Sequence, residues 1–396
     1  MRIAIDARWI FSEMSGIGVY THELVCGLAE LDRQNDYLLL FCDEAVCDRS
    51  FRDPRLRDAP NFTPVLVRHG PFSITSQIML PCWLARQRID LFHSTNYMMP
   101  LAAFPRYRAG RRKCVVTIHD VIPLILRGHA PRSRKSRLYP VYTRLMLEVG
   151  RRADAILTVS RASAGDIVKH LRIPNASAGR VHAVYNGVSP LFFRTEDEPV
   201  VTPSEEPARP RRVLYVGRSD PYKNLPLLVR AVAEVRKQAG FPIELVIVGA
   251  PDPRYPEASR LAAELGMGEA LQWRGHMDDV ELRAVYRECD VLAHPSMYEG
   301  FGLQILEAMA SGLPVVCTTG GSLREVAGDA AVLVEPNSLS ELTNGIRMVL
   351  ERPEYATELA KRGIARASTF SWSRTASETL AVYRDVTGPR APVRLL

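Results

Sequence analysis

The sequence predicts an α/β protein whose two domains are each built on a parallel, doubly wound sheet. Short apolar runs alternate with stretches of helical periodicity along nearly the whole chain, which is the pattern of strand–helix–strand units. The length of 396 residues is enough for two or three domains of ordinary size. Residues 195–211 interrupt the pattern with four prolines and five acids. We therefore expect one domain over 1–190, a linker over 191–211 and a second domain over 212–371.

Composition narrows the class of protein. Hydrophobic residues make up 46% of the chain and charged residues 24%, which is the balance of a globular protein. The seven cysteines are scattered, odd in number and never spaced C-x-x-C, so neither a disulfide framework nor a zinc site is indicated and a reducing compartment fits. The chain contains neither a recognisable signal peptide nor a run of 18 apolar residues. The expectation is a soluble, cytoplasmic protein.

Positive charge is concentrated between residues 101 and 152, where thirteen lysines or arginines stand against only two acids, Asp120 and Glu148. One interpretation is a solvated face, and another is attraction to an anionic membrane, worth roughly 1 kcal/mol per basic residue. Nucleic acid is a third, but nothing in the chain resembles an aromatic RNA-binding sheet or a recognition helix. We therefore expect no nucleic-acid partner and leave the first two interpretations open.

The first domain is expected to begin with a strand over 2–6, a glycine loop containing Gly16 and Gly18, and a helix over 19–31. Such a loop could belong to a dinucleotide-binding fingerprint. The third glycine of that fingerprint is replaced by Thr21, so the pattern is incomplete. A nicotinamide-dependent dehydrogenase is therefore only an alternative.

A histidine and an aspartate end one of the later strands of this domain. A lone histidine is more often structural than catalytic, but ligands of open α/β sheets bind at the carboxyl ends of the strands, where His119 lies. Asp120 could orient His119 or act as a base, although adjacent strand residues point to opposite faces. The strands expected after the first are 37–42, 89–93, 114–120, 152–160 and 181–188.

In the second domain a strand over 213–216 is followed by Arg218 and Lys223, and then by a helix over 225–238. Taken alone, an arginine and a lysine after a strand are most often surface residues. A diphosphate, however, needs positive charge that is held in place, and arginine supplies a planar fork where lysine supplies a point charge. Strands and helices are expected to continue alternating over 244–249, 256–265, 271–275 and 278–288.

The most informative stretch is Y-E-G-F-G-L-Q-I-L-E, residues 298–307. It follows a buried strand over 291–294, two glycines let its backbone turn, and helical periodicity begins at about Leu303. Glu299 and Glu307 are either solvated surface carboxylates or acceptors for the hydroxyls of two sugars, with an anion-binding helix end between them. The second interpretation suits a sugar nucleotide, which consists of a sugar, a diphosphate and a ribose.

The pattern E-G-F-G-L-x-x-L-E resembles the donor-site signature of the family 4 glycosyltransferases, which have the GT-B fold, although Gln304 stands where that family usually has proline. The resemblance implies two Rossmann-like domains facing each other across a cleft, the first on the acceptor side, and a helix at about 372–387 that crosses back to the first domain. It implies that Glu299 holds the donor sugar and Glu307 the ribose. The resemblance also implies that the backbone of Gly300, Phe301, Gly302 and Leu303 lines the sugar and diphosphate, and that Arg218 and Lys223 bind the phosphates. His119 would meet the donor sugar near the reacting carbon. Gly16 and Gly18 would contact the donor phosphate or the acceptor.

The same resemblance implies a retaining hexosyltransferase that works by front-side attack, without a covalent enzyme intermediate. No D-x-D triplet occurs in the chain, so we expect no metal and no other cofactor. The segments D-A-R, S-G-I-G-V-Y and I-H-D-V-I-P-L look most like bacterial mannosyltransferases of surface-polysaccharide synthesis. GDP-mannose is therefore the first expected donor. A glycan or a polyprenyl-diphosphate-linked oligosaccharide is the expected acceptor, with peripheral contact to the inner face of the plasma membrane through the basic 101–152 region. A UDP- or dTDP-sugar donor, a GT-B sugar-nucleotide epimerase and a catalytically silent partner subunit are the alternatives.

Overall fold

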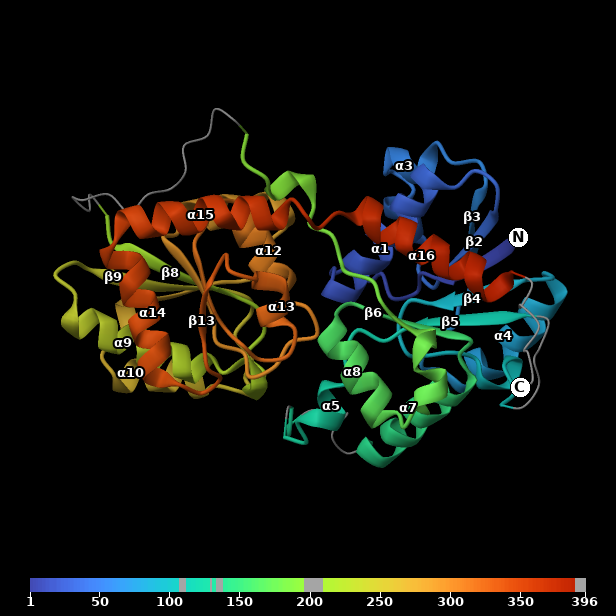
Figure 1. Ribbon diagram of the computed structural model, residues 1–396, viewed down its shortest axis with the longest axis horizontal. Coiled ribbons are helices and arrows are strands. Elements are labelled where there is room, and N and C mark those ends of the chain that lie inside the picture. The colour runs from blue at the N-terminus through green and yellow to red at the C-terminus, as the bar shows by residue number, and fades with distance from the viewer. Residues whose placement is uncertain (107–111, 129, 133–137, 196–208, 389–396) are drawn as a thin grey trace. The chain divides into compact units, whose positions relative to one another are not determined.

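The computed structural model describes residues 1–106, 112–128, 130–132, 138–195 and 209–388 (Figure 1). Most of the expected linker and the last eight residues lie outside the described residues. No helix in the described part of the chain is long and apolar enough to cross a membrane. The chain forms two compact units: unit 1 comprises Met1–Val121, Tyr139–Gly187 and Trp372–Leu396, and unit 2 comprises Ile122–Leu138 and Val188–Ser371.

Unit 1 is built on a seven-stranded sheet in the order β3-β2-β1-β4-β5-β6-β7, in which every pairing is parallel. Most of its central strand residues are buried, which is why these strands are short apolar runs in the sequence. The strands are β1 (Arg2–Asp6), β2 (Asp36–Phe41), β3 (Phe62–Leu66), β4 (Leu91–Ser94), β5 (Lys113–Thr117), β6 (Ala155–Thr158) and β7 (Val181–Ala183).

The first and last helices of unit 1, α1 and α16, pack side by side (Figure 1). A Cβ added to Gly27 of α1 would lie 2.9 Å from the Cβ of Ala376 of α16, so glycine permits this close approach. The helices are α1 (Gly16–Leu31), α2 (Glu44–Ser50), α3 (Pro54–Arg57), α4 (Ile74–Arg86), α7 (Tyr139–Arg152), α8 (Arg161–His170) and α16 (Trp372–Thr387), with 3-10 turns η1 (Leu101–Ala103) and η2 (Asn175–Arg180).

Unit 2 is built on a six-stranded parallel sheet in the order β10-β9-β8-β11-β12-β13. Its hydrophobic core joins the buried faces of α9 and α14 to the sheet. The strands are β8 (Arg211–Val216), β9 (Ile243–Val248), β10 (Leu271–Arg274), β11 (Val291–His294), β12 (Val315–Thr318) and β13 (Val332–Val334). The helices are α5 (Ile122–Ile125), α9 (Leu225–Gln238), α10 (Glu257–Glu264), α11 (Asp279–Glu288), α12 (Leu303–Ala310), α13 (Leu323–Ala327), α14 (Leu339–Glu351) and α15 (Pro353–Ala367), with 3-10 turns η3 (Pro190–Phe192), η4 (Pro221–Lys223) and η5 (Gly268–Ala270).

The expected fold class, two doubly wound parallel sheets, is confirmed. One segment differs from the sequence-based boundaries, because residues 122–138 group with unit 2 and not with the first domain. The physical reason lies in the contacts of Arg132, which pairs with Glu257 of α10 at 2.8 Å and whose backbone N–H donates to the hydroxyl of Tyr255 at 3.2 Å.

In each sheet the strand order reverses beside the first strand of that unit. β1 lies between β2 and β4, and β8 lies between β9 and β11. At such a reversal the loops that leave the carboxyl ends of two neighbouring strands diverge, and this is where open α/β sheets bind ligands. The loops after β1 and β4, and after β8 and β11, are therefore the places to look for a site.

Candidate active site

The loops that follow β8 and β11 carry three of the predicted site residues of unit 2. Arg218 and Lys223 follow β8, and Glu299 follows β11. A hydrogen bond of 2.7 Å from the Met297 N–H to the Tyr222 carbonyl ties the two loops together. The reversal of strand order thus brings a cation and a carboxylate from different loops to one place.

Glu299 is the centre of a buried polar cluster. Its Oε1 accepts a hydrogen bond from Lys223 Nζ at 2.6 Å and another from His294 Nε2 at 3.0 Å, while Ser296 Oγ lies 3.2 Å from the same histidine nitrogen. Burial alone would raise the pKa of Glu299, but the charge of Lys223 and the contact with His294 outweigh it and lower the pKa to about 2. The carboxylate is therefore ionised at any physiological pH. Its other oxygen, Oε2, accepts no hydrogen bond from the residues that the structure describes. Oε2 can therefore accept a hydrogen bond from a ligand hydroxyl.

Glycines hold the backbone of Glu299 against the loop after β12. Gly321 has a φ of +63°, and a Cβ there would lie 2.3 Å from the Glu299 carbonyl oxygen. Ser322 donates from its backbone N–H to the same oxygen at 3.0 Å and from its hydroxyl at 3.1 Å. Only glycine fits this approach, so the loop after β12 fixes where the Glu299 side chain starts.

The predicted lining residues Gly300, Phe301, Gly302 and Leu303 form the turn from β11 into α12. Gly302 adopts a left-handed conformation with φ +98° and precedes α12 without a side-chain cap. A helix start of this kind offers backbone N–H groups to an anion. The Phe301 ring is 5% exposed and packs edge-to-face on Phe370, so this residue can line a ligand through its backbone only.

Glu307 lies on α12 in surroundings that contrast with those of Glu299. The Tyr286 hydroxyl of α11 donates to its Oε2 at 2.8 Å, and the charge of Asp279 also acts on it. Desolvation of this partly buried group outweighs the tyrosine hydrogen bond and raises the pKa of Glu307 to about 7. The carboxyl is thus poised to change charge near neutral pH.

Arg218 extends into solvent from the loop after β8. Its side chain is 74% exposed and its Nη2 lies 2.7 Å from Oδ2 of Asp220, a residue that is 3% exposed. The hydroxyl of the buried Tyr215 donates to the Arg218 carbonyl at 2.6 Å. The backbone of Arg218 is therefore fixed while its guanidinium can turn toward an anion.

In unit 1, His119 follows β5 and reaches across to β4. Its Nε2 lies 3.1 Å from the Thr95 carbonyl, which can only accept, so Nε2 carries the proton and Nδ1 is an acceptor in the neutral ring. Burial lowers the pKa of His119 to about 4, so the ring is neutral at physiological pH. The Tyr20 ring packs edge-on at 4.8 Å between centroids.

Behind His119 a chain of buried hydrogen bonds crosses the unit. The Tyr20 hydroxyl lies 2.9 Å from Thr117 Oγ1, which lies 2.8 Å from His93 Nε2. His93 Nδ1 in turn lies 2.5 Å from the Tyr383 hydroxyl of α16. The last helix of the chain is thus linked to the ring that packs on His119.

The glycine loop forms the start of α1. Gly16 is the first residue of that helix, and Ser15 caps it by accepting from the Gly18 N–H at 3.3 Å. A Cβ on Gly18 would lie in ordinary contact with the Trp9 carbonyl oxygen, at 3.4 Å, so Gly18 places α1 against the loop after β1. The predicted residues therefore fall into two groups: Gly16, Gly18 and His119 lie in unit 1, and the others lie in unit 2.

Comparison with known proteins finds two glycosyltransferase profiles, one for each half of the chain. The profile described as "Glycosyltransferase Family 4" matches residues 14–190, and that described as "Glycosyl transferases group 1" matches residues 198–366. The chain is 34% identical to the MMP alpha-(1->4)-mannosyltransferase of Mycolicibacterium hassiacum, over 97% of this chain and 98% of that protein. The chain belongs to glycosyltransferase family 4.

Another relative of this family 4 glycosyltransferase is O-antigen chain mannosyltransferase B of Escherichia coli, 28% identical over 97% of this chain and all of that protein. Among solved structures, sucrose-phosphate synthase of Thermosynechococcus elongatus superposes with a TM-score of 0.73 at 23% identity, covering 97% of this chain and 98% of that one. The GT-B fold expected from the sequence is confirmed.

The basic region of this family 4 glycosyltransferase is largely paired where it is described. Arg106, Arg151 and Arg152 converge on Glu148, while Lys113 lies 3.5 Å from Asp154 and Arg132 pairs with Glu257 at 2.8 Å. A count of charges overstates the free positive charge of this region. The basic residues 108, 111, 134, 135 and 137 lie outside the described residues.

One group of possible metal ligands occurs among the described residues. Nε2 of His22 and Sγ of Cys26 on α1 meet Oδ2 of Asp53, the residue that caps α3, at 3.4 to 3.6 Å from one another. Both oxygens of Asp53 already accept from Arg55, which also pairs with Glu23. We interpret the group as a structural tie between α1 and α3.

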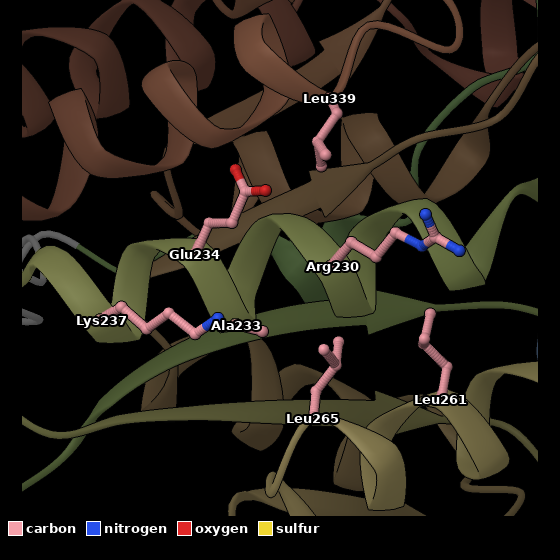
Figure 2. Close-up of a pocket in the computed structure, with 7 residues that line it drawn as sticks. All are labelled: Arg230, Ala233, Glu234, Lys237, Leu261, Leu265 and Leu339. Atoms are coloured by element: carbon pink, nitrogen blue, oxygen red, sulfur yellow. The ribbon is translucent and has the colours of Figure 1, made fainter.

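A cavity of about 310 Å³ lies among helices α9, α10 and α14 of unit 2 (Figure 2). None of the predicted site residues lines it. Its walls come from α9, from α10 and from the start of α14: Arg230, Ala233, Glu234, Lys237, Leu261, Leu265 and Leu339.

Two side chains that contact the predicted site residues, His294 and Tyr286, were not predicted from the sequence. His294 ends β11 as His119 follows β5, so its position after an apolar run was the available signal. His294 is fully buried and bonds Glu299 directly. Tyr286, the partner of Glu307, lies 21 residues earlier on a different helix, and no local pattern indicates that contact.

Proposed function

We propose that this family 4 glycosyltransferase is a retaining mannosyltransferase that moves mannose from GDP-mannose to a glycan or lipid-linked oligosaccharide in surface-polysaccharide assembly. The observation that carries the proposal is the ionised Glu299, held on one oxygen by Lys223 and His294 with its other oxygen available to sugar hydroxyls. The choice of mannose rests on the two mannosyltransferases to which nearly the whole chain is similar.

In this proposal the leaving group is a nucleoside diphosphate, and negative charge builds on its phosphate oxygen in the transition state. Lys223 and the start of α12 supply positive charge and N–H donors that are already in place, and the exposed guanidinium of Arg218 turns toward the same phosphate when the donor binds. Preorganised donors at a developing negative charge are usually the largest catalytic contribution. These residues would take the part that a bridging metal plays elsewhere.

Glu307 accepts the ribose hydroxyls in this proposal, and it must be ionised to accept two of them. His119 is neutral, and its Nδ1 accepts no hydrogen bond from the residues that the structure describes, so it accepts from a hydroxyl of the donor sugar and adds no positive charge near the reacting carbon. The transfer proceeds on one face of the sugar, with retention and without a covalent enzyme intermediate.

Peripheral contact with an anionic membrane belongs to the proposal. It is supported by α4, whose solvent side carries Ile74, Ile78 and Met79 with exposures of 79%, 63% and 53%. Exposed arginines 86 and 88 follow at the end of this helix. An apolar helix face beside basic residues is the pattern of an interfacial helix. Sedimentation with phosphatidylglycerol vesicles at physiological salt tests it, and protein that stays in the supernatant would refute it.

Ligand-induced thermal stabilisation across GDP, UDP, ADP, dTDP and NAD is the first test of the function. A ligand at 100 times its Kd should stabilise the protein by about 2.7 kcal/mol. A shift with GDP alone, followed by mannose transfer with retained anomeric configuration in NMR, supports the proposal. A shift with UDP or dTDP alone would mean that the donor is a UDP- or dTDP-sugar, and a shift with NAD would indicate a dehydrogenase. Formation of product without any added acceptor would indicate an epimerase.

A further inference from the structure

Five aromatic rings gather in unit 1 apart from the predicted site residues. Trp9 is central, with ring centroids 6.4 Å from Phe11, 5.2 Å from Phe72 and 6.3 Å from Tyr97. Phe72 also lies 6.2 Å from Tyr97, and Tyr97 lies 5.6 Å from Tyr142 of α7. We call these five residues the aromatic cluster. All five of these pairs are edge-to-face or tilted, so the rings present faces in several directions.

The aromatic cluster lies at the reversal of strand order in the sheet of unit 1. Trp9 and Phe11 come from the loop after β1, and Tyr97 comes from the loop after β4. The same edge carries His119, which bonds the carbonyl of Thr95 two residues before Tyr97. Gly18 packs on the Trp9 carbonyl. The cluster is therefore continuous with the predicted site residues of this unit.

The cluster is partly open to solvent and partly closed. Phe11 and Phe72 are 42% and 56% exposed, Tyr97 and Tyr142 are half-buried, and Trp9 is 4% exposed. A folded protein gains nothing from leaving two large rings in water. Exposed rings that continue into buried ones mark a surface that something covers.

A second observation concerns polar atoms at the cluster. The indole Nε1 of Trp9 is buried and has no hydrogen-bond partner among the described residues. A buried donor without an acceptor is costly, and most native proteins avoid it. The carboxylate of Asp120 lies near enough to act on both Tyr97 and Tyr142. The cluster thus combines ring faces with one unsatisfied donor and a nearby carboxylate.

We propose that the aromatic cluster is the acceptor subsite and that it takes the pyranose rings of a glycan chain. A pyranose has C–H faces that pack on aromatic rings and a rim of hydroxyls that donate and accept hydrogen bonds. It can cover Phe11 and Phe72 and, when these loop side chains rotate, bring an acceptor oxygen to Trp9 Nε1. An acyl chain would cover the rings but would leave that N–H unpaired. The inference deepens the proposed function and rests on it.

The experiment measures glycan binding without requiring catalysis. Binding of an α-linked mannotetraose is followed by titration calorimetry in wild type, Phe72→Ala, Phe11→Ala and Trp9→Phe. Trp9→Phe keeps an aromatic ring and removes the N–H, and Phe11 and Phe72 are exposed enough that their truncation leaves the fold intact. Leu31→Ala is the matched control, because Leu31 is 45% exposed at the far end of α1. Binding of GDP-mannose is measured in every variant.

We expect each cluster variant to weaken mannotetraose binding about tenfold or more with GDP-mannose binding unchanged, Phe11→Ala and Phe72→Ala to keep the wild-type melting temperature, and Leu31→Ala to match wild type. Wild-type affinity in all three cluster variants would overturn the proposal. The proposal would also be overturned if the cluster variants lost binding to phosphatidylglycerol vesicles while keeping their binding to the glycan. Absence of glycan binding by the wild type would overturn it as well. If no nucleotide sugar binds while glycan binding still depends on the cluster, the proposed transfer fails and the glycan subsite stands.

Discussion

Glu307 gives the sharpest prediction, because its pKa of about 7 connects stability to pH. Burial raises the pKa of this carboxyl, and two groups of α11 among the described residues act on it as well: Tyr286, which donates a hydrogen bond, and Asp279, which repels its charge. The ordinary value is 4.5, so the folded state binds this proton more tightly than the unfolded state does. The resulting stability is fully present below about pH 4.5 and is lost as the pH rises through about 7. At about 1.4 kcal/mol per pKa unit, the loss is up to about 3 kcal/mol.

The perturbation is Glu307→Gln, whose amide oxygen can still accept from Tyr286 and which carries no charge at any pH. Urea unfolding of wild type and variant at pH 5 and pH 8 gives the test. From pH 5 to pH 8, we expect the free energy of unfolding of the variant to rise relative to that of wild type by up to about 3 kcal/mol, since all other titrations are common to both proteins. The exposed Glu264→Gln on α10 is the control and should show no such gain. A constant difference between wild type and Glu307→Gln would refute the argument.

The same carboxyl should couple donor binding to pH. If only the ionised form accepts the ribose hydroxyls, the affinity for GDP-mannose should fall about tenfold from pH 8 to pH 6 in wild type. A diphosphate diester does not titrate in this range, which is why the nucleotide sugar is a better ligand here than GDP. In Glu307→Gln the affinity should be weaker and independent of pH. A flat wild-type profile would remove Glu307 from the donor site.

Three further predictions test the neighbouring residues. Arg218→Ala should lower kcat of the folded protein about 10²–10³-fold, and a loss under threefold would exclude it from stabilising the leaving group. Lys223→Met should lower the free energy of unfolding by about 3–5 kcal/mol because it removes the cation that pairs with the buried Glu299 carboxylate and leaves it the hydrogen bond of His294. Adding Glu299→Gln should restore part of this loss in urea titrations, and no recovery would contradict the pairing. Gly321→Ala should lower the melting temperature by several degrees through its positive φ and the clash with the Glu299 carbonyl, whereas Gly268→Ala, with no atom within 4 Å of its Cβ, should not.

Much of the fold was predictable because buried parallel strands are short apolar runs that end where glycine or a polar residue begins. The run 291–294 coincides with β11, and the helix expected from about Leu303 is α12. The expected strand over 213–216 lacks only the first two residues of β8, which begins at Arg211. These elements were found because every relevant signal is local in sequence.

Contacts between distant residues were not predictable from such patterns. His93 and Tyr383 are 290 residues apart and share no motif, yet they form one buried hydrogen bond. The lysines and arginines between residues 101 and 152 gave a strongly basic window, but Glu148 alone pairs with three of them, Arg106, Arg151 and Arg152. The number of charges is a property of the sequence, whereas the number left unpaired is set by how the chain folds.

The pKa values of the two glutamates of the central motif could not be inferred from their spacing either. Both are removed from water, which by itself raises the pKa of a carboxyl. Glu299 has Lys223 and His294 against one oxygen and stays ionised, whereas Glu307 is acted on by a tyrosine hydroxyl and an aspartate and titrates near neutrality. Two identical side chains eight positions apart thus differ in charge state near neutral pH. In the proposed function, the donor-sugar hydroxyls would meet a permanent charge at Glu299, while the ribose hydroxyls would have to displace a proton at Glu307. Binding at one end of the donor would then be independent of pH and binding at the other end would be coupled to it.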